Sequence, residues 1–491
     1  TEIKELVRRA VGWVTTQRMR ASIPSELGLD PAYVTFSLLP LCSLWLKSSA
    51  CSIAIPERAS VTKEFEMNFR QACVLSLCAV LVGSSLAQAE NWPNWRGPKN
   101  DGMSSETGLP TEWDAEKNVA WQLKLPGSGG ATPVVWDDRI FLTAVVRDEL
   151  TLICVGTDGK TRWSEVVSRG NKDVRGDEGN SAANSPSTDG KHVWTMFANG
   201  AVACFTVDGK KVWALDLPDR YGKFEIAFGL TSTPVLDNGR LYLQLIHGVN
   251  NGVPSKGLVV CVDAATGKEI WQAERSTDGT NENKHSYASP MMYDHGGLKY
   301  LVTHGADFVI GHDLKNGKEL WRCGNLNVKS KYDKTLRFVS SPLCADGMIV
   351  VPTAKRGPVR VIRPDGKGDI TFNKDVHLWS HEKTPDVPSP LIHDGLVYLC
   401  MQDGNLFCLD QKTGEEYYFE RTHRQRHRAS PVYADGHLYL TARDGLVSVV
   451  KTGKKFELVS QNELGEAIAA SPAISNGTIY LRTFDSLWAI R

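Results

Sequence analysis

Basic side chains form the group of residues in this chain that could most readily do chemistry. The segment 421–428, Arg-Thr-His-Arg-Gln-Arg-His-Arg, is the densest basic run of the sequence. Several such groups brought together would favour an anion, such as a carboxylate, a phosphate, a sulfated or uronic sugar, or a partner's acidic loop. The alternative is that these long side chains are solvated and act separately. The candidate ligand-binding residues are His285, Arg337, Arg356, Arg426, Arg428 and Arg443.

Signatures of known catalytic sites are missing from the sequence. There is no Gly-x-Ser-x-Gly, no His-Glu-x-x-His, no phosphate-binding loop and no Cys-x-x-Cys-His for a covalent haem. His377, His381 and Glu382 have a spacing that suggests a metal, but this segment is expected to be strand or loop. No catalytic residue is therefore assigned and no metal ligand is predicted. The sequence favours a protein that is not an enzyme, and leaves that question open.

The elements that must position the basic residues are copies of one unit. A Ser/Thr-Pro pair recurs at intervals of 41 to 56 residues. The prolines of these pairs are Pro133, Pro186, Pro234, Pro290, Pro342, Pro390, Pro431 and Pro472. Each is followed by apolar residues, by a turn such as Asn238-Gly239, and by a β-rich run such as 240–243. Because Gly and Asn supply the positive φ of two-residue turns, the pattern predicts a β-hairpin in every unit.

A second hairpin completes most units. Its turn glycine precedes a tryptophan by four residues in Gly159/Trp163, Gly209/Trp213, Gly267/Trp271 and Gly317/Trp321. Unit six has Tyr418 in this place, and units five and seven are degenerate, with Trp379 and Phe456 as their nearest aromatics. Four strands at this period predict an all-β fold, an eight-bladed β-propeller of four-stranded antiparallel blades. The repeated aromatic is expected to pack against the neighbouring blade rather than to bind a cofactor.

The ends of the array predict how the ring closes. The last unit stops at Arg491 after its third strand, whereas a strand-like run, 119–123, precedes the first Thr-Pro pair. We expect this N-terminal strand to complete the last blade and cover its edge. Four units carry a cysteine at one position of the third strand, namely Cys154, Cys204, Cys261 and Cys408. Repetition at a core position favours packing over metal binding.

The first ninety residues differ from the repeats. From Met67 the chain shows a charged start, an apolar run over 72–82 and the small-x-small triplet 87–89, which together indicate a secretory signal. We predict a non-native upstream extension over 1–66, a signal peptide over 67–89, a lead-in over 90–117 and the propeller over 118–491. The alternative for 1–66 is a structured N-terminal domain. The mature protein would begin at Glu90 and be exported, periplasmic or extracellular.

Composition narrows the possible partners. The 56 Lys and Arg balance the 56 Asp and Glu, so the chain lacks the basic surplus of a nucleic-acid binder. The apolar stretch 33–46 is shorter than the ~20 residues that a membrane span needs. Seven cysteines follow residue 89, and an odd number cannot all pair within one chain. We expect a monomer with no transmembrane span, no nucleic-acid partner and no disulfide scaffold.

The repeat resembles that of a known family. Residues 263–271 read Asp-Ala-Ala-Thr-Gly-Lys-Glu-Ile-Trp, and 313–321 are close to this. The pattern is similar to the Asp-x-x-Thr-Gly-x-x-x-Trp tail of pyrroloquinoline-quinone (PQQ) repeat propellers, from about residue 118 to the C-terminus. The resemblance implies one of two classes. Quinoprotein dehydrogenases hold PQQ and Ca²⁺ in a central funnel, whereas propellers such as the barrel-assembly lipoprotein bind no quinone.

The resemblance also implies what a dehydrogenase would need. Ca²⁺ takes six to eight oxygen ligands. The residues that could contribute are Asp177, Glu178, Asn180, Asp307, Asp403 and Asp444. No tryptophan outside the docking positions is expected to form a floor for the quinone, since Trp136 and Trp194 are not predicted to face the funnel. No catalytic residue can be carried over.

We take the residue five before each Ser/Thr-Pro proline as the ring that faces the funnel. This ring contains Ser128, Ser181, Gly229, His285, Arg337, Pro385, Arg426 and Ala467. Arg428 and Tyr287 lie two residues closer to the strand, and the loops between strands two and three add Lys355, Arg356 and Arg443. The sequence favours a non-catalytic binding or scaffold propeller for a protein partner or an anionic glycan, without a cofactor. The alternative is a PQQ- and calcium-dependent dehydrogenase of an alcohol or sugar.

Overall fold

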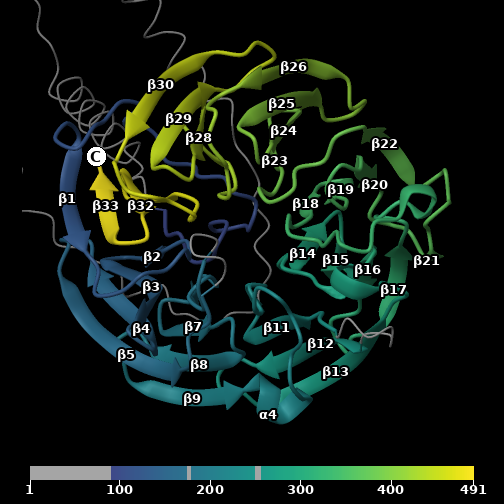
Figure 1. Ribbon diagram of the computed structural model, residues 1–491, viewed down its shortest axis with the longest axis horizontal. Helices are drawn as coiled ribbons and strands as arrows, with labels where there is room; N and C mark the ends of the chain where they lie inside the picture. The colour runs from purple at the N-terminus through teal and green to yellow at the C-terminus, as the bar shows by residue number, and fades with distance from the viewer. Residues whose placement is uncertain (1–89, 174–178, 249–255) are drawn as a thin grey trace, which may run out of the picture. The chain divides into compact units, whose positions relative to one another are not determined.

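Eight β-sheets are arranged in a ring (Figure 1). The computed structural model describes residues 90–173, 179–248 and 256–491. The chain divides into two units, Thr1–Ser85 and Leu86–Arg491, and the ring lies within the second. The regions 1–66 and 67–89 of the sequence prediction lie outside the described residues. The ring itself confirms the prediction of an eight-bladed antiparallel β-propeller.

The blades follow one another along the chain, each with its first strand nearest the centre (Figure 1). The strands of blades one to four are β2 (Val134–Trp136), β3 (Arg139–Val146), β4 (Glu149–Gly156) and β5 (Thr161–Arg169); β6 (Ser187–Thr188), β7 (His192–Met196), β8 (Ala201–Thr206) and β9 (Lys211–Asp216); β10 (Val235–Asp237), β11 (Arg240–Leu245), β12 (Lys256–Asp263) and β13 (Glu269–Ser276); β14 (Met291–His295), β15 (Leu298–Gly305), β16 (Phe308–His312) and β17 (Glu319–Cys323).

The second half of the ring has the same order. The strands of blades five to eight are β18 (Leu343–Ala345), β19 (Met348–Pro352), β20 (Val359–Ile362) and β22 (His377–His381); β23 (Leu391–His393), β24 (Leu396–Cys400), β25 (Asn405–Asp410) and β26 (Glu416–Arg421); β27 (Val432–Ala434), β28 (His437–Thr441), β29 (Leu446–Lys451) and β30 (Leu458–Glu463); β31 (Ala473–Ser475), β32 (Thr478–Arg482), β33 (Ser486–Ile490) and β1 (Val119–Lys124). The short elements α4 (Leu217–Tyr221), η1 (Asn281–Lys284) and η2 (Lys329–Lys331) lie between blades. In the described part of the chain no helix is long and apolar enough to cross a membrane.

The ring is closed by the N-terminal strand, as the sequence predicts. β1 pairs antiparallel with β33, which places Trp121 opposite Ala489 and Leu123 opposite Leu487. The Trp121 indole Nε1–H donates to the Thr157 carbonyl of blade one at 2.8 Å. Blade eight is thus built from both ends of the propeller sequence, and β1 covers the outer edge of β33.

The repeated Gly and Trp form the joints between blades. Trp213 of blade two donates from Nε1 to the Ala264 carbonyl of blade three at 2.9 Å, and its ring lies on the turn glycine Gly267. A Cβ on Gly267 would come within 2.8 Å of that ring. The same bond joins Trp163 to Val207, Trp271 to Leu314, and Trp379 to Gln411. The prediction that these aromatics dock on the next blade is confirmed.

Trp321 is the exception, and the sequence of blade five explains it. Blade five has no Gly turn at the docking position; instead β21 (Gly368–Asp369) adds a parallel fifth strand to β17. Trp321 is 1% exposed and lies over Gly311 of its own blade, where a Cβ would be 2.3 Å from the indole nitrogen. Gly311 stands at the place that holds a cysteine in four other blades, so its missing side chain makes room for the indole.

The cysteines are packing residues. Cys154, Cys204 and Cys261 lie opposite Trp163, Trp213 and Trp271 in their sheets, and Cys408 lies opposite Tyr418. The seven cysteines of the described residues are buried and unpaired. Burial raises the pKa of Cys154 and of Cys204 to about 12. These thiols are therefore neutral small hydrophobes, in agreement with the sequence prediction.

Residues 90–113, here called the strap, cross the face of the ring formed by the turns between first and second strands. The strap begins beside blades one and two, where Trp92 pairs with Val135 and the Pro93 carbonyl accepts from Thr188 N–H. It then contacts blade seven through Met103. Near its end the Trp113 indole stacks on Tyr439 with the ring centroids 6.3 Å apart. The lead-in of the sequence prediction is therefore part of the propeller core.

Candidate functional site

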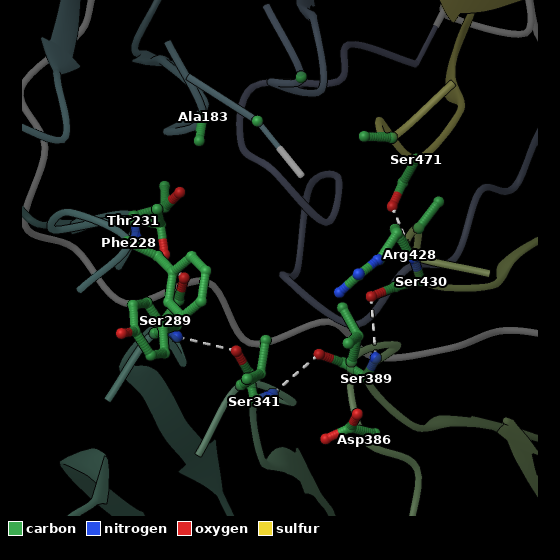
Figure 2. A pocket seen from close by; sticks show the side chains of 18 of the residues that line it. Ala183, Phe228, Thr231, Ser289, Ser341, Asp386, Ser389, Arg428, Ser430 and Ser471 are labelled. Carbon is green, nitrogen blue, oxygen red and sulfur yellow. Dashed lines mark hydrogen bonds between the residues drawn. The ribbon is translucent and has the colours of Figure 1, made fainter. Parts of the chain in front are cut away.

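A cavity of about 320 Å³ lies where the segments leading into the first strands meet at the centre of the ring (Figure 2). These segments are extended, so alternate residues face the same way. The residue one before each Ser/Thr-Pro proline and the residue three before it both line the cavity in all eight blades. The residue between them is outside the lining in seven of the eight blades, with Ala429 as the exception. Because every second residue faces the cavity, the eight repeats surround it with two rings of eight residues each.

The lower ring consists of hydroxyl groups. Its members are Thr132, Ser185, Thr233, Ser289, Ser341, Ser389, Ser430 and Ser471. From blade two to blade eight, the backbone N–H of each ring residue donates to the side-chain hydroxyl of the ring residue in the next blade. Examples are Ser289 to Ser341 at 2.8 Å and Ser341 to Ser389 at 3.0 Å (Figure 2). Because these oxygens accept from the backbone, their O–H groups can still donate toward the cavity.

The upper ring carries the chemical asymmetry of the site. Its members are Gly130, Ala183, Thr231, Tyr287, Val339, Val387, Arg428 and Ala469, all within the described residues. Arg428 is the charged member of this ring, and its guanidinium extends into the cavity (Figure 2). One cation placed at one of eight equivalent positions breaks the symmetry of the repeat. This side of the cavity therefore carries a guanidinium, a group with several N–H donors.

The opposite wall is aromatic. Phe228, from the segment leading into blade three, faces Arg428 across the cavity (Figure 2). Its ring packs edge-on against Tyr287 at 5.6 Å between centroids. The Arg337 guanidinium lies 4.4 Å from the Phe228 centroid and forms an ion pair with Glu282 at 2.6 Å. Arg337 is therefore neutralised and mainly fixes this wall, whereas the wall itself offers apolar surface.

A second ion pair lies at the edge of the cavity. Lys355 Nζ is 2.9 Å from Asp386 Oδ2, and both side chains line the cavity. The Lys355 side chain is 44% exposed, so the pair is accessible to solvent and an incoming anion could compete for the lysine. Asp386 is the carboxylate among the described lining residues, and Lys355 neutralises it.

Trp95 of the strap also lines the cavity. It touches a second, smaller void below, lined by Pro186, Pro234 and Pro290, and thus lies at the end of the cavity nearest the strap. The expectation that no tryptophan outside the docking positions faces the funnel was wrong. The error arose because Trp95 precedes the repeats and has no equivalent within them.

Two of the six candidate binding residues, Arg337 and Arg428, line the cavity. Arg426 and Arg356 are exposed residues outside the lining. Arg443 lies over the ring of Phe484 at 4.1 Å. His285 is 3% exposed, and its Nε2 is 3.0 Å from the Gly248 carbonyl. Burial lowers the pKa of His285, so this imidazole is neutral near pH 7.

The carboxylates of the described residues do not form a calcium site. The described residues contain no group of three or more His, Cys, Asp or Glu side chains able to hold a metal. Asp307 binds Lys329 at 3.0 Å, and Asp444 binds His423 at 2.8 Å. Asn180 lines the cavity, but its amide bonds the backbone of Ser128 and Ala182. Asp177 and Glu178 lie outside the described residues.

Position within the repeat could have identified the lining residues. The ring five before each proline contributes Arg337 alone to the cavity, whereas the rings one and three before it contribute every member. At position five, Ser128 pairs instead with Val145 of β3, away from the cavity lining. Choosing the residue three before each proline would have identified Arg428 as the one charged residue of its ring.

Comparison with known proteins agrees with this architecture. A polyvinylalcohol dehydrogenase of Sphingopyxis sp. (strain 113P3) is 25% identical over 241 residues, which is 45% of this chain and 34% of that protein. The match thus spans about a third of the relative's length.

Two solved structures share the fold. BamB from Moraxella catarrhalis has a TM-score of 0.54 at 12% identity, covering 76% of this chain and 96% of that one. Quinohemoprotein alcohol dehydrogenase from Comamonas testosteroni has a TM-score of 0.59 at 13% identity, covering 82% and 80%. The family described as outer membrane protein assembly factor BamB matches residues 103–251 and 255–420. More than half of the chain is matched, and the chain belongs to this family of PQQ-like repeat propellers.

Proposed function

We propose that this protein is an exported, non-catalytic binding propeller that takes an organic anion into its central cavity. The observation that carries the proposal is Arg428, which brings the charged side chain to a ring of eight otherwise uncharged positions. A guanidinium binds carboxylate through two parallel hydrogen bonds, which gives orientation as well as affinity. The ligand would direct its acidic group toward Arg428.

The rest of the cavity defines the body of the ligand. Phe228 and Tyr287 supply an aromatic wall opposite Arg428, and Trp95 supplies a further indole at the strap end. The hydroxyl ring supplies O–H donors around the circumference. Ring-shaped molecules with one acidic group suit these surfaces, because their flat faces pack on aromatic side chains. An acidic sugar or an aromatic carboxylate meets both requirements.

Calorimetric titration of the full chain tests this function. The ligands are uronic acid oligosaccharides, aromatic carboxylates, their neutral amides, and PQQ with and without Ca²⁺. We expect acids to bind and their amides to bind at least tenfold more weakly, because a hydrogen bond to a charged group contributes about 1.5–3 kcal/mol. Arg428→Gln should lose this preference.

Arg426→Gln is the matched control, since Arg426 lies in the same loop but outside the cavity lining. It should bind like the parent protein. Equal binding of acids and amides, or an unchanged acid affinity in Arg428→Gln, would contradict the proposal. Calcium-dependent PQQ binding with reduction of a dye by an alcohol would instead favour a dehydrogenase.

A further inference from the structure

The backbone nitrogen of Glu90 has an unusual acceptor. Its N–H donates to Glu106 Oε1 at 2.9 Å. The same carboxylate accepts from the backbone N–H groups of Asn476 at 2.8 Å and Gly477 at 2.9 Å, in the turn between β31 and β32. Glu106 therefore ties the start of the strap to blade eight through three N–H donors.

The side chain of Glu90 is held as firmly as its nitrogen. Glu90 Oε2 accepts from Ser104 Oγ at 2.6 Å and from Ser105 N–H at 2.8 Å. Two carboxylates, Glu90 and Glu106, thus meet at this point, and within the described part of the chain neither forms an ion pair with Lys, Arg or His. The donors that contact the two carboxylates in the described residues are neutral N–H and O–H groups. A positive charge at the Glu90 nitrogen would complete the arrangement.

We infer that the bond between Ala89 and Glu90 is hydrolysed during export and that the new α-ammonium of Glu90 binds the Glu106 carboxylate. Water adds to the Ala89 carbonyl carbon and the bond to the Glu90 nitrogen breaks. This leaves a carboxylate on Ala89 and an ammonium on Glu90, with a protease of the export route as catalyst. The triplet 87–89, Ala-Gln-Ala, has the small residues that such cleavage needs. The inference does not depend on which ligand the cavity takes.

Docking of the ammonium has a structural consequence. Glu90 is five residues from Trp95, which lines the cavity, and the strap is fastened to blade eight at Glu106. An ion pair between these two residues would hold the strap against the ring more firmly than an amide N–H does. Cleavage would thus stabilise the end of the cavity that Trp95 forms.

The first measurement is the intact mass and N-terminal sequence of the full chain after expression through a bacterial export route. We expect Glu90 as the first residue. Any other mature N-terminus would overturn the inference. The second measurement is the pKa of the α-amine, followed by NMR after ¹³C-labelling of amines by reductive methylation. Docking predicts a value above the ordinary range of roughly 7.7–8.0.

Glu106→Gln should return the α-amine pKa to its ordinary range and lower the thermal midpoint of the processed protein. Glu112→Gln is the matched control, because Glu112 lies in the same strap but pairs with the exposed Lys117. It should leave the α-amine pKa unchanged. An ordinary α-amine pKa in the parent protein would refute the docking without any variant. Equal effects of the two substitutions would also refute it.

Discussion

Gly267→Ala tests whether the turn glycines serve the neighbouring tryptophan as well as the backbone. Gly267 has a φ of +67°, and a Cβ there would lie 2.8 Å from Cδ2 and Cε3 of Trp213. The left-handed conformation costs an alanine about 1–2 kcal/mol. Forcing a methyl group into a packed ring costs about 1–3 kcal/mol more. We therefore expect the substitution to lower the free energy of unfolding by about 2–5 kcal/mol.

Gly239→Ala separates the two causes. Gly239 has a φ of +71°, but nothing lies within 4 Å of the position of its Cβ. This variant should lose only the backbone part, about 1–2 kcal/mol. Urea unfolding followed by tryptophan fluorescence measures both variants, with the midpoint shift converted through a common slope.

Equal losses in Gly239→Ala and Gly267→Ala would refute the packing argument. A further check removes the ring itself. In a Trp213→Ala background, Gly267→Ala should cost only the backbone part, because the three atoms nearest to the added methyl group all belong to the Trp213 ring. A full loss in that background would show that the tryptophan is not the reason for glycine at this turn.

Three further outcomes are expected. Burial lowers the pKa of His304 to about 3 and of His312 to about 4, so below pH 6.5 protons bind the unfolded chain before the folded one. Urea unfolding should therefore show the free energy of unfolding falling by about 1.4 kcal/mol per pH unit for each histidine, until its folded pKa is reached. A flat profile over about pH 6.5–4 would contradict this. Trp121→Ala should lower the free energy of unfolding by about 2–3 kcal/mol, because the half-buried indole and its hydrogen bond to Thr157 help to hold β1. A loss below about 1 kcal/mol would mean that β1 closes the ring without help from this indole. The buried cysteines should react with a thiol reagent only at the rate of unfolding, and rapid labelling of the folded protein would contradict their burial.

Most of the fold could be predicted because a propeller repeats one local pattern. Turn pairs such as Asn238-Gly239 adopt positive φ values of 46° and 71°, as their residue types require. The closing strand was predictable for a related reason. The last unit lacks a fourth strand, and one extra strand, β1, precedes the first unit. Trp321 was not, because its orientation depends on an irregular segment of the next blade.

The site was predicted only in part. Arg337 and Arg428 were named, but the ring chosen lay two residues too far from the strand, where only Arg337 lines the cavity. Trp95 was missed because no repeat relates it to the cavity. Arg337 was counted as a ligand-binding cation, whereas Glu282 pairs with it across 55 residues of sequence, a contact that no local pattern indicates.

The sequence by itself determined the number of blades, the hairpin turns, the Gly–Trp joints and the closure of the ring. These features depend on residues close together in the chain or on positions repeated at a fixed period, so local stereochemistry and counting suffice. Only the tertiary structure decided which cations face the cavity, that Glu282 pairs with Arg337, and that the strap brings Trp95 and Glu106 to the propeller. Those contacts join residues far apart in the sequence, and their geometry depends on how eight blades and a non-repeating segment pack together.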